Sequence, residues 1–350
     1  MDLTNQNNTK ESPEYLKMSL ASAMTLDFSR GFFYRNAKNP CINLLLKYNE
    51  GCIANCSYCG LAKNRGGNFD EKTFIKVEWP TFSLDEIIER IDSYKDRVKR
   101  ICISMVTNKR APGDVKLVLK RIKGRLKTPL SVLMTPTILT QKDIEDFKLC
   151  GTDKVGIAID TAKEEIFEIH RGKNVKGPHE WKKYWDTIDI SLKIFGKKNV
   201  GIHLVVGLGE TENEMLEIIQ KIYEKGALAH LFSFFAENGS PLESVFQPSL
   251  GTYYRIQLGR HLIHEGIASI KDFLFDSSGK LISFNVSPKL LDEIIASGYP
   301  FMTSGCAGED GRVACNRPYG NCLPGPDIRN YPFKPNENDV ARIRSNLFAD

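Results

Sequence analysis

Three cysteines lie close together in the segment GCIANCSYCGLAKN, which begins at Gly51. They are Cys52, Cys56 and Cys59, separated by three residues and then by two. A closed structural zinc site normally uses four ligands, and iron–sulfur clusters usually use four cysteines. If these three thiolates hold three irons of a 4Fe-4S cluster, the fourth iron can bind a small molecule. The alternatives are a zinc site with a distant fourth ligand and a loop of free thiols.

Three more cysteines follow near the end of the chain, in SGCAGEDGRVACNRPYGNC. Cys306, Cys315 and Cys322 fall within seventeen residues of a loop without helical or strand periodicity. Such spacing suits a second iron–sulfur cluster, and Arg312 and Arg317 could donate to its sulfurs or hold a carboxylate. A structural zinc site or unpaired thiols remain the alternatives.

The composition is that of an ordinary globular protein. Of its 350 residues, 41% are hydrophobic and 26% charged, and the net charge is +5. No apolar run is long enough for a membrane helix, and the polar N-terminus resembles no signal peptide. Nine cysteines in such a chain favour metal or redox use in a reducing compartment. We therefore expect a cytoplasmic protein that binds neither membranes nor nucleic acid.

The chain alternates short β-rich runs with amphipathic helical runs, which predicts a parallel sheet of the α/β class. Six such units favour a TIM-type (β/α) barrel, and runs near 273 and 300 could complete eight strands. We expect a helical extension over 1–40, with helix over 11–38, a barrel over 41–304 and a cysteine-containing tail over 305–350. The predicted strands are 42–47, 100–106, 130–135, 154–159, 199–207 and 229–235. The predicted helices are 84–96, 113–123, 141–149, 163–169, 180–195 and 211–225.

Barrel enzymes carry their chemistry on the loops that follow the strands. The first cysteine group follows the first predicted strand, and the tail follows the last. Both groups are therefore expected at the same catalytic mouth. Cys41 and Cys150 precede strands, so they are interpreted as structural thiols at the opposite end.

The first cysteine group, with Tyr58 just before its third member, resembles the C-x3-C-x-aromatic-C signature of radical S-adenosylmethionine (SAM) enzymes. That resemblance implies that the open iron of a 4Fe-4S cluster chelates the amino and carboxylate groups of SAM. It also implies that an electron from the cluster breaks a sulfur–carbon bond and yields a 5'-deoxyadenosyl radical.

Two further segments resemble the biotin synthase branch of that superfamily. VGIAIDTA ends in Asp160 and Thr161, and the resemblance implies that Asp160 binds the SAM ribose. HLVVGLGETENEM resembles the strand that lies against adenine, which implies SAM contacts from Val205, Gly207, Gly209 and Glu210. The alternatives are that Asp160 caps the next helix and that the glycines only form a tight turn.

The chain also departs from biotin synthase, which holds a second cluster on three cysteines and an arginine. Cys102 falls where the first of those cysteines lies, but Leu133 and Gly201 occupy the other two places. One ligand of three cannot hold that cluster. We therefore interpret Cys102 as a buried core thiol.

The tail, with CNRPYGN and IRNYPFKP, and the segment HRGKNVKGPHEWKKYW resemble the two-component lipoyl synthases. This resemblance implies sulfur insertion into an octanoyl chain on a lysine of an acceptor protein, with sulfur from an auxiliary cluster. It also implies Ser304 as a candidate fourth ligand, a second radical SAM protein as partner, and ferredoxin or flavodoxin as electron donor. Two alternatives stay open: another radical reaction, such as carbon-skeleton rearrangement or cofactor assembly, and a non-catalytic electron-transfer or scaffold subunit.

Overall fold

The protein is described by a computed structural model that covers residues 10–67, 72–73, 77–320 and 322–349. The first nine residues, which belong to the N-terminal segment expected to lack a targeting signal, lie outside these ranges. In the part of the chain that is described, no helix is long and apolar enough to cross a membrane.

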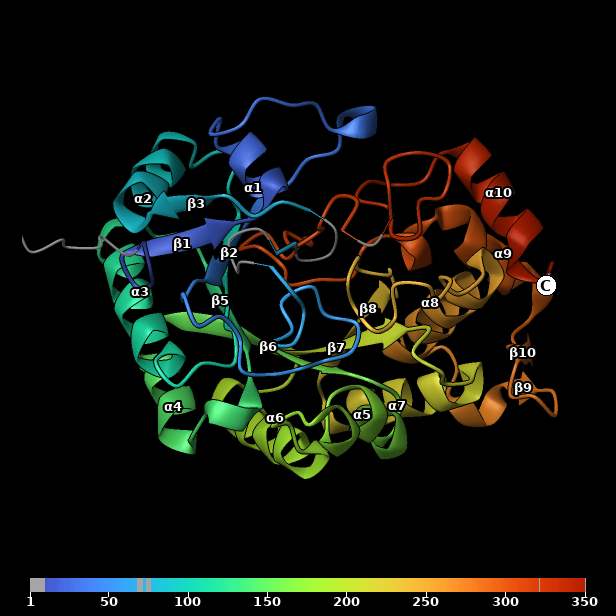
Figure 1. Ribbon diagram of the computed structural model, residues 1–350. Helices are drawn as coiled ribbons and strands as arrows, with labels where there is room; N and C mark the ends of the chain where they lie inside the picture. Colours follow the sequence, from blue (N-terminus) through green and yellow to red (C-terminus); the bar gives the residue numbers. More distant parts are fainter. Residues whose placement is uncertain (1–9, 68–71, 74–76, 321, 350) are drawn as a thin grey trace, which may run out of the picture.

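An eight-stranded sheet forms the centre of the molecule, and helices cover its outer face (Figure 1). Six of its strands run parallel and follow the predicted order, which confirms the α/β fold of barrel type. The parallel strands are β2 (Cys41–Leu46), β4 (Arg100–Ser104), β5 (Leu130–Met134), β6 (Thr152–Asp160), β7 (Val200–Val206) and β8 (Leu228–Ser233). The helices packed outside them are α2 (Leu84–Ser93), α3 (Ala111–Arg125), α4 (Gln141–Leu149), α5 (Glu164–His170), α6 (Trp181–Phe195) and α7 (Glu212–Lys225).

Local sequence sets where several of these helices begin. In α7, the Thr211 hydroxyl accepts from the Glu214 amide, and the Glu214 carboxylate accepts from the Thr211 amide. This capping box satisfies amide groups that have no partner in the first turn of a helix. The same arrangement starts α2 at Ser83 and α4 at Thr140.

The remaining two strands of the sheet come from the N-terminal side, so the prediction of a helix over 11–38 was wrong. Residues Tyr15–Met18 form β1, and only Leu20–Thr25 form a helix, α1. β1 pairs antiparallel with β2 and with β3 (Thr81–Ser83). The backbone of β1 thereby satisfies the hydrogen bonds of the open edge of β2, a long-range gain that helical periodicity does not reveal.

The two strands predicted near 273 and 300 do not join the sheet. β9 (Leu274–Phe275) and β10 (Leu281–Ser283) form a separate antiparallel pair, and Tyr299–Phe301 form a 3-10 turn. In chain order, β9 and β10 lie between α8 (Leu250–His264) and α9 (Pro288–Ser297), and the 3-10 turn follows α9. The barrel is therefore not closed by a seventh and an eighth parallel strand.

The tail instead connects β8 with the segment just before β2 (Figure 1). Next to β8, the Ser304 hydroxyl accepts from the Leu231 amide at 3.4 Å. On the N-terminal side, the Asn316 side chain donates to the Lys38 carbonyl at 2.6 Å. The last helix, α10 (Glu337–Leu347), packs on α8 and α9. The tail thus shares the barrel's hydrophobic core.

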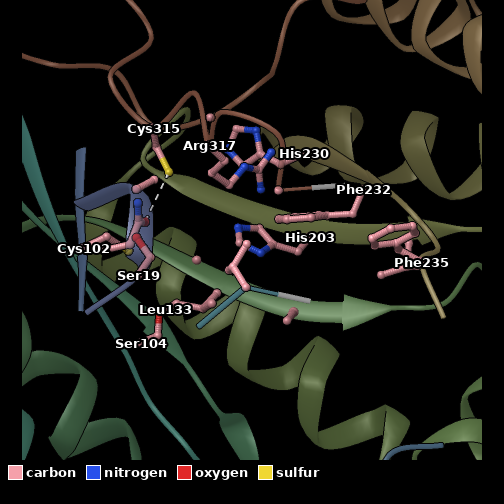
Figure 2. A pocket seen from close by; sticks show the side chains of 18 of the residues that line it. Ser19, Cys102, Ser104, Leu133, His203, His230, Phe232, Phe235, Cys315 and Arg317 are labelled. Carbon is pink, nitrogen blue, oxygen red and sulfur yellow. Dashed lines mark hydrogen bonds between the residues drawn. The ribbon is translucent and has the colours of Figure 1, made fainter. Parts of the chain in front are cut away.

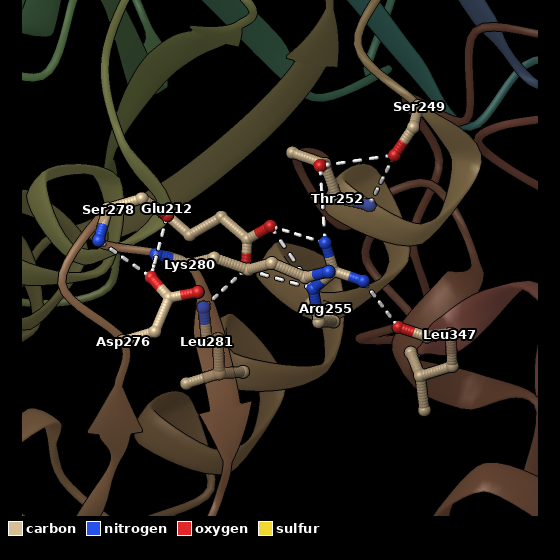
Figure 3. A network of polar contacts seen from close by, with 9 residues as sticks. All are labelled: Glu212, Ser249, Thr252, Arg255, Asp276, Ser278, Lys280, Leu281 and Leu347. Atoms are coloured by element: carbon tan, nitrogen blue, oxygen red, sulfur yellow. Dashed lines mark hydrogen bonds and ion pairs between the residues drawn. The ribbon is translucent and has the colours of Figure 1, made fainter. Parts of the chain in front are cut away.

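A buried ion pair connects the helices near the C-terminus (Figure 3). The side chains of Arg255 on α8 and Glu212 on α7 are 1% and 6% exposed and lie 2.6 Å apart. Arg255 also donates to the Leu347 carbonyl at 2.6 Å, and Glu212 accepts from the Leu281 amide at 2.9 Å. One charge pair therefore ties α7, α8, β10 and α10 together.

Candidate functional site

The loop that carries Cys52, Cys56 and Cys59 leaves the carboxyl end of β2, as predicted for a catalytic loop. Backbone hydrogen bonds hold it on both sides: the Ile53 amide donates to the Thr107 carbonyl, and the Ser57 amide donates to the His170 carbonyl. These contacts fix the loop against the ends of the neighbouring β/α units.

The thiols of this loop are largely buried. Burial raises the pKa of Cys56 to about 11 and also raises the pKa of Cys59. Thiolates are the metal-binding form, so loading iron here must release protons. Among the described residues, no three His, Cys, Asp or Glu side chains lie close enough to hold a single metal ion. The donor set of three thiols on one loop fits three corners of an iron–sulfur cluster.

Tyr58 and Asp160 meet directly above the barrel. The Tyr58 hydroxyl donates to the Asp160 carboxylate at 2.5 Å, and the Arg171 guanidinium lies 3.0 Å from the same oxygen. Burial, more than the Asp160 charge, raises the pKa of Tyr58, so the phenol keeps its proton and donates. Arg171 also donates to the Tyr184 hydroxyl. Arg171 lies in the HRGKN segment, and its sequence position alone does not indicate that it reaches Asp160.

Asp160 does not cap the helix that follows it, so that alternative was wrong. Helix α5 begins after Lys163, and no side chain caps it. Asp160 instead ends β6 with a positive φ of 66°, which turns its carboxylate toward Tyr58 and Arg171. Asp and Asn adopt this left-handed conformation more readily than other residues.

We predict that Asp160→Asn weakens SAM binding by about 1.5 to 3 kcal/mol, the range for a hydrogen bond to a charged group, and leaves the iron content unchanged. Asn keeps the backbone conformation but removes the charge. Equilibrium dialysis of the iron-loaded protein measures the affinity, with Asp186→Asn on the outer face of α6 as the control. An unchanged SAM affinity in Asp160→Asn would remove the ribose role.

The turn after β7 has the conformation that its glycines permit. Gly207 and Gly209 have φ of 106° and 109°, where a side chain would be strained. The Glu210 carboxylate accepts from the amides of Gly207 and Leu208 at 2.7 and 2.9 Å. Glu210 therefore shapes the turn, while Val205 lines the cavity beside it.

The shifted pKa of Glu210 predicts that the free energy of unfolding depends on pH. Burial raises its pKa from 4.5 to about 7 even though backbone amides oppose the shift. Because the folded state holds this proton more tightly than the unfolded state, the stability it contributes is complete below pH 4.5 and is lost as the pH rises to about 7. Relative to Glu210→Gln, the wild type should lose stability over this window in urea titrations. A constant difference across the window would contradict the shifted pKa.

His170 connects the cysteine loop to the glycine turn. Its Nδ1 lies 2.7 Å from the Ser57 hydroxyl, and its Nε2 lies 2.9 Å from the Leu208 carbonyl. Since a carbonyl only accepts, Nε2 carries a proton, and a neutral ring then accepts from Ser57. Burial lowers the pKa of His170, in keeping with the neutral form. Only the folded chain brings these three segments together.

A cavity of about 230 Å³ runs through the barrel from this site (Figure 2). Tyr58, Cys59 and Asp160 line one end, at the carboxyl ends of the strands. Its walls are mostly aromatic and aliphatic, with Trp79, Val205, Leu133, Phe232, Phe234 and Phe235. Burial lowers the pKa of His203 to about 3 and that of His230 well below its ordinary value, so both rings are neutral here.

The other end of the cavity contains Cys102, Cys306 and Cys315. The expectation that the tail cysteines lie at the catalytic mouth was wrong. Arg100, the first residue of β4, donates to the Ala307 carbonyl at 2.7 Å, so this part of the tail lies at the amino ends of the strands. The tail folds back below the barrel because Arg100 and the edge of β8 offer it partners there.

The structure separates Cys322 from the other two tail cysteines. Cys322 is 4% exposed within the hydrophobic core, and it is not among the residues that line the cavity. Its charged neighbours are Arg329 and Asp327. Ser304 lies beside β8, with its hydroxyl on the Leu231 amide. Cys102, interpreted from the sequence as a core thiol, lies on the cavity wall instead.

Comparison with known proteins places the fold. The family model described as the radical SAM superfamily matches residues 46–222, just over half of the chain. The crystal structure of methylornithine synthase (PylB) is 12% identical, with 70% of this chain and 66% of that chain covered and a TM-score of 0.51. HydG, the FeFe-hydrogenase maturase from Carboxydothermus hydrogenoformans, is 13% identical, with 70% and 56% covered and a TM-score of 0.48.

The chain thus spans between about half and two thirds of the length of these solved structures. No curated protein sequence matches it. At such low identity, the likeness to solved structures bears on the fold alone.

Proposed function

Because this chain belongs to the radical SAM superfamily, we propose that it inserts sulfur into an octanoyl chain carried on a lysine of an acceptor protein. The observation that carries the proposal is the cavity, which connects the Cys59 and Asp160 end to the Cys306 and Cys315 end. Unactivated C–H bonds resist acids, bases and nucleophiles. When bound, the 4Fe-4S cluster and SAM supply the radical that can take a hydrogen atom from such a bond.

The residues of the cavity suit an alkyl substrate. Phe234 and Phe235 offer apolar contacts, the neutral His203 and His230 add no charge, and the Arg317 guanidinium lies on the Phe232 ring toward the tail cysteines. A narrow apolar channel orients a flexible chain and excludes water from a radical intermediate. The thiols at the far end mark where sulfur could be supplied, from an auxiliary cluster that would be consumed as it donates.

Three partners follow from the proposal. The substrate would arrive on a lipoyl-acceptor protein, a second radical SAM protein would complete the pair, and a ferredoxin or flavodoxin would supply electrons. The lipoyl synthase-like assignment rests on the tail and on the HRGKN segment.

The proposal is tested with anaerobically reconstituted protein, SAM, dithionite and an acceptor domain that carries an octanoyl-lysine, with and without the second radical SAM protein. Mass spectrometry should find the octanoyl group heavier by sulfur, together with 5'-deoxyadenosine. 5'-Deoxyadenosine without sulfur incorporation would favour a rearrangement or cofactor-assembly reaction. The absence of 5'-deoxyadenosine would favour an electron-transfer or scaffold subunit.

A further inference from the structure

A tight hairpin in the tail brings two cysteines together. The amides of Ala314 and Cys315 both donate to the Cys306 carbonyl at 3.0 Å. A Cβ at Gly305 would come within 2.0 Å of the Cys315 carbonyl oxygen, so only glycine allows this approach. Arg100 then fixes the hairpin through the Ala307 carbonyl. Cys306 and Cys315 are therefore held as a pair beneath the barrel.

Two strands present cysteines to this pair. In the parallel register of β2 and β4, Asn43 lies opposite Cys102, and Cys41 lies two residues before Asn43 on the same face. The thiols of Cys41 and Cys315 both lie within 4 Å of the Asn43 side-chain oxygen, at 3.9 and 3.8 Å. Figure 2 shows Cys315 and Cys102 on the same side of the cavity.

The four thiols form one electrostatic group. Burial raises the pKa of Cys102 to about 12, and the neighbouring Cys315 and Cys306 raise it further. Cys41 interacts with Cys315, Cys102 and Cys306, whereas Cys322 is not among the main causes of the shift at any of them. Cys41 was expected to be a structural thiol at the end opposite the catalytic mouth, and the fold places it there beside Cys315.

Arg317 provides an independent observation. Its guanidinium lies 3.7 Å from the centre of the Phe232 ring, and its Nε is buried without a hydrogen-bond partner among the described residues. No carboxylate among the described residues forms an ion pair with Arg317. Its Nη2 donates to the Ser304 carbonyl at 3.0 Å, and the groups whose negative charge would favour its cation are the thiols of Cys315, Cys306 and Cys102 and the Tyr253 hydroxyl. A buried cation needs an anion nearby.

We infer that Cys41, Cys102, Cys306 and Cys315 are the ligands of a second iron–sulfur cluster at the end of the cavity where the tail lies, with Arg317 as its counter-charge. Four thiolates are the usual ligand set of such clusters, and a guanidinium N–H can donate to the negatively charged sulfur. This inference deepens the proposed function by locating its sulfur source. It replaces Cys322, which the cysteine spacing had suggested, and Ser304, which the resemblance had implied, with Cys41 and Cys102.

The experiment counts metal in a background that lacks the first cluster. The Cys52→Ala/Cys56→Ala/Cys59→Ala variant, reconstituted anaerobically, should retain about two or four irons per chain with matching sulfide. Adding Cys102→Ser, Cys306→Ser, Cys315→Ser or Cys41→Ser should reduce the iron to near zero. Adding Cys322→Ser, or Cys150→Ser at the end of α4, should leave it unchanged. Circular dichroism checks that each variant folds.

Arg317 gives a second readout in the same triple-alanine background, one that keeps all four proposed ligands. Arg317→Met should make the reduction potential of the remaining cluster more negative than Arg317→Lys does, because loss of the cation disfavours the added electron. Equal potentials in the two variants would contradict the counter-charge role.

Several results would overturn the inference. These are zinc in place of iron, a Cys41–Cys315 disulfide, no iron in the triple-alanine background, or iron that survives Cys102→Ser and disappears in Cys322→Ser. The metal count needs no substrate. If the predicted iron pattern is found but no sulfur enters an octanoyl chain, the cluster assignment stands and only the proposed substrate fails.

Discussion

Replacing Cys52, Cys56 or Cys59 with alanine should abolish reductive cleavage of SAM, down to the rate of a reaction without protein. The physical reason is that each thiolate is expected to hold one iron of the cluster whose fourth iron binds SAM. Because Cys56 and Cys59 are buried on a loop pinned at Ile53 and Ser57, no other thiol can take the vacated place without moving that loop. The formation of 5'-deoxyadenosine in anaerobic, dithionite-reduced samples measures the effect.

Cys150→Ala is the matched control, since it removes a thiol at the end of α4 that belongs to neither cysteine group. It should cleave SAM like the wild type. Undiminished cleavage by the Cys52→Ala/Cys56→Ala/Cys59→Ala variant would show that the first cysteine group does not hold the SAM-binding cluster.

Arg255→Met should destabilise the protein by about 3 to 5 kcal/mol, the cost of leaving one partner of a buried ion pair uncompensated. The substitution strands the Glu212 carboxylate, which is 6% exposed, and leaves the Leu347 carbonyl without its donor. Figure 3 shows how this charge pair ties four elements together. Urea titration monitored by circular dichroism measures the loss.

A surface ion pair provides the comparison. Lys182 and Asp186 lie 2.7 Å apart on α6 with side chains 84% and 50% exposed. Lys182→Met should cost no more than about 0.5 kcal/mol, because water solvates the remaining charge. If Arg255→Met and Lys182→Met cost the same, the buried pair does not anchor the C-terminal helices.

The sequence predicted the parallel strands well for a physical reason. Each β/α unit has its own hydrophobic period, turn residues and helix caps, such as Thr211 with Glu214 at the start of α7. The N-terminal strand was missed because Tyr15–Met18 is only four residues long and extends by pairing with Leu44–Leu46, almost thirty residues away. Such a strand is stabilised by pairing with its partner strand, so the hydrophobic periodicity of its own residues does not reveal it.

The first cysteine group could be identified from spacing alone, since one short loop carries all three thiols. The partners of Asp160 could not be identified from the sequence, because Tyr58 and Arg171 reach it from a different loop and a different helix end. The positive φ of Asp160, which directs its carboxylate, is a property of the folded turn.

The sequence by itself therefore determined the order of the β/α units and the three-cysteine loop, because both depend on residues that are neighbours in the chain. Only the tertiary structure decided that Cys41 and Cys102 meet Cys306 and Cys315, since their convergence depends on strand register and on a tail that folds back under the barrel. Spacing suggested Cys322 as the third member of the tail group. Packing placed it in the core instead, because proximity in sequence does not fix where an irregular loop directs its side chains.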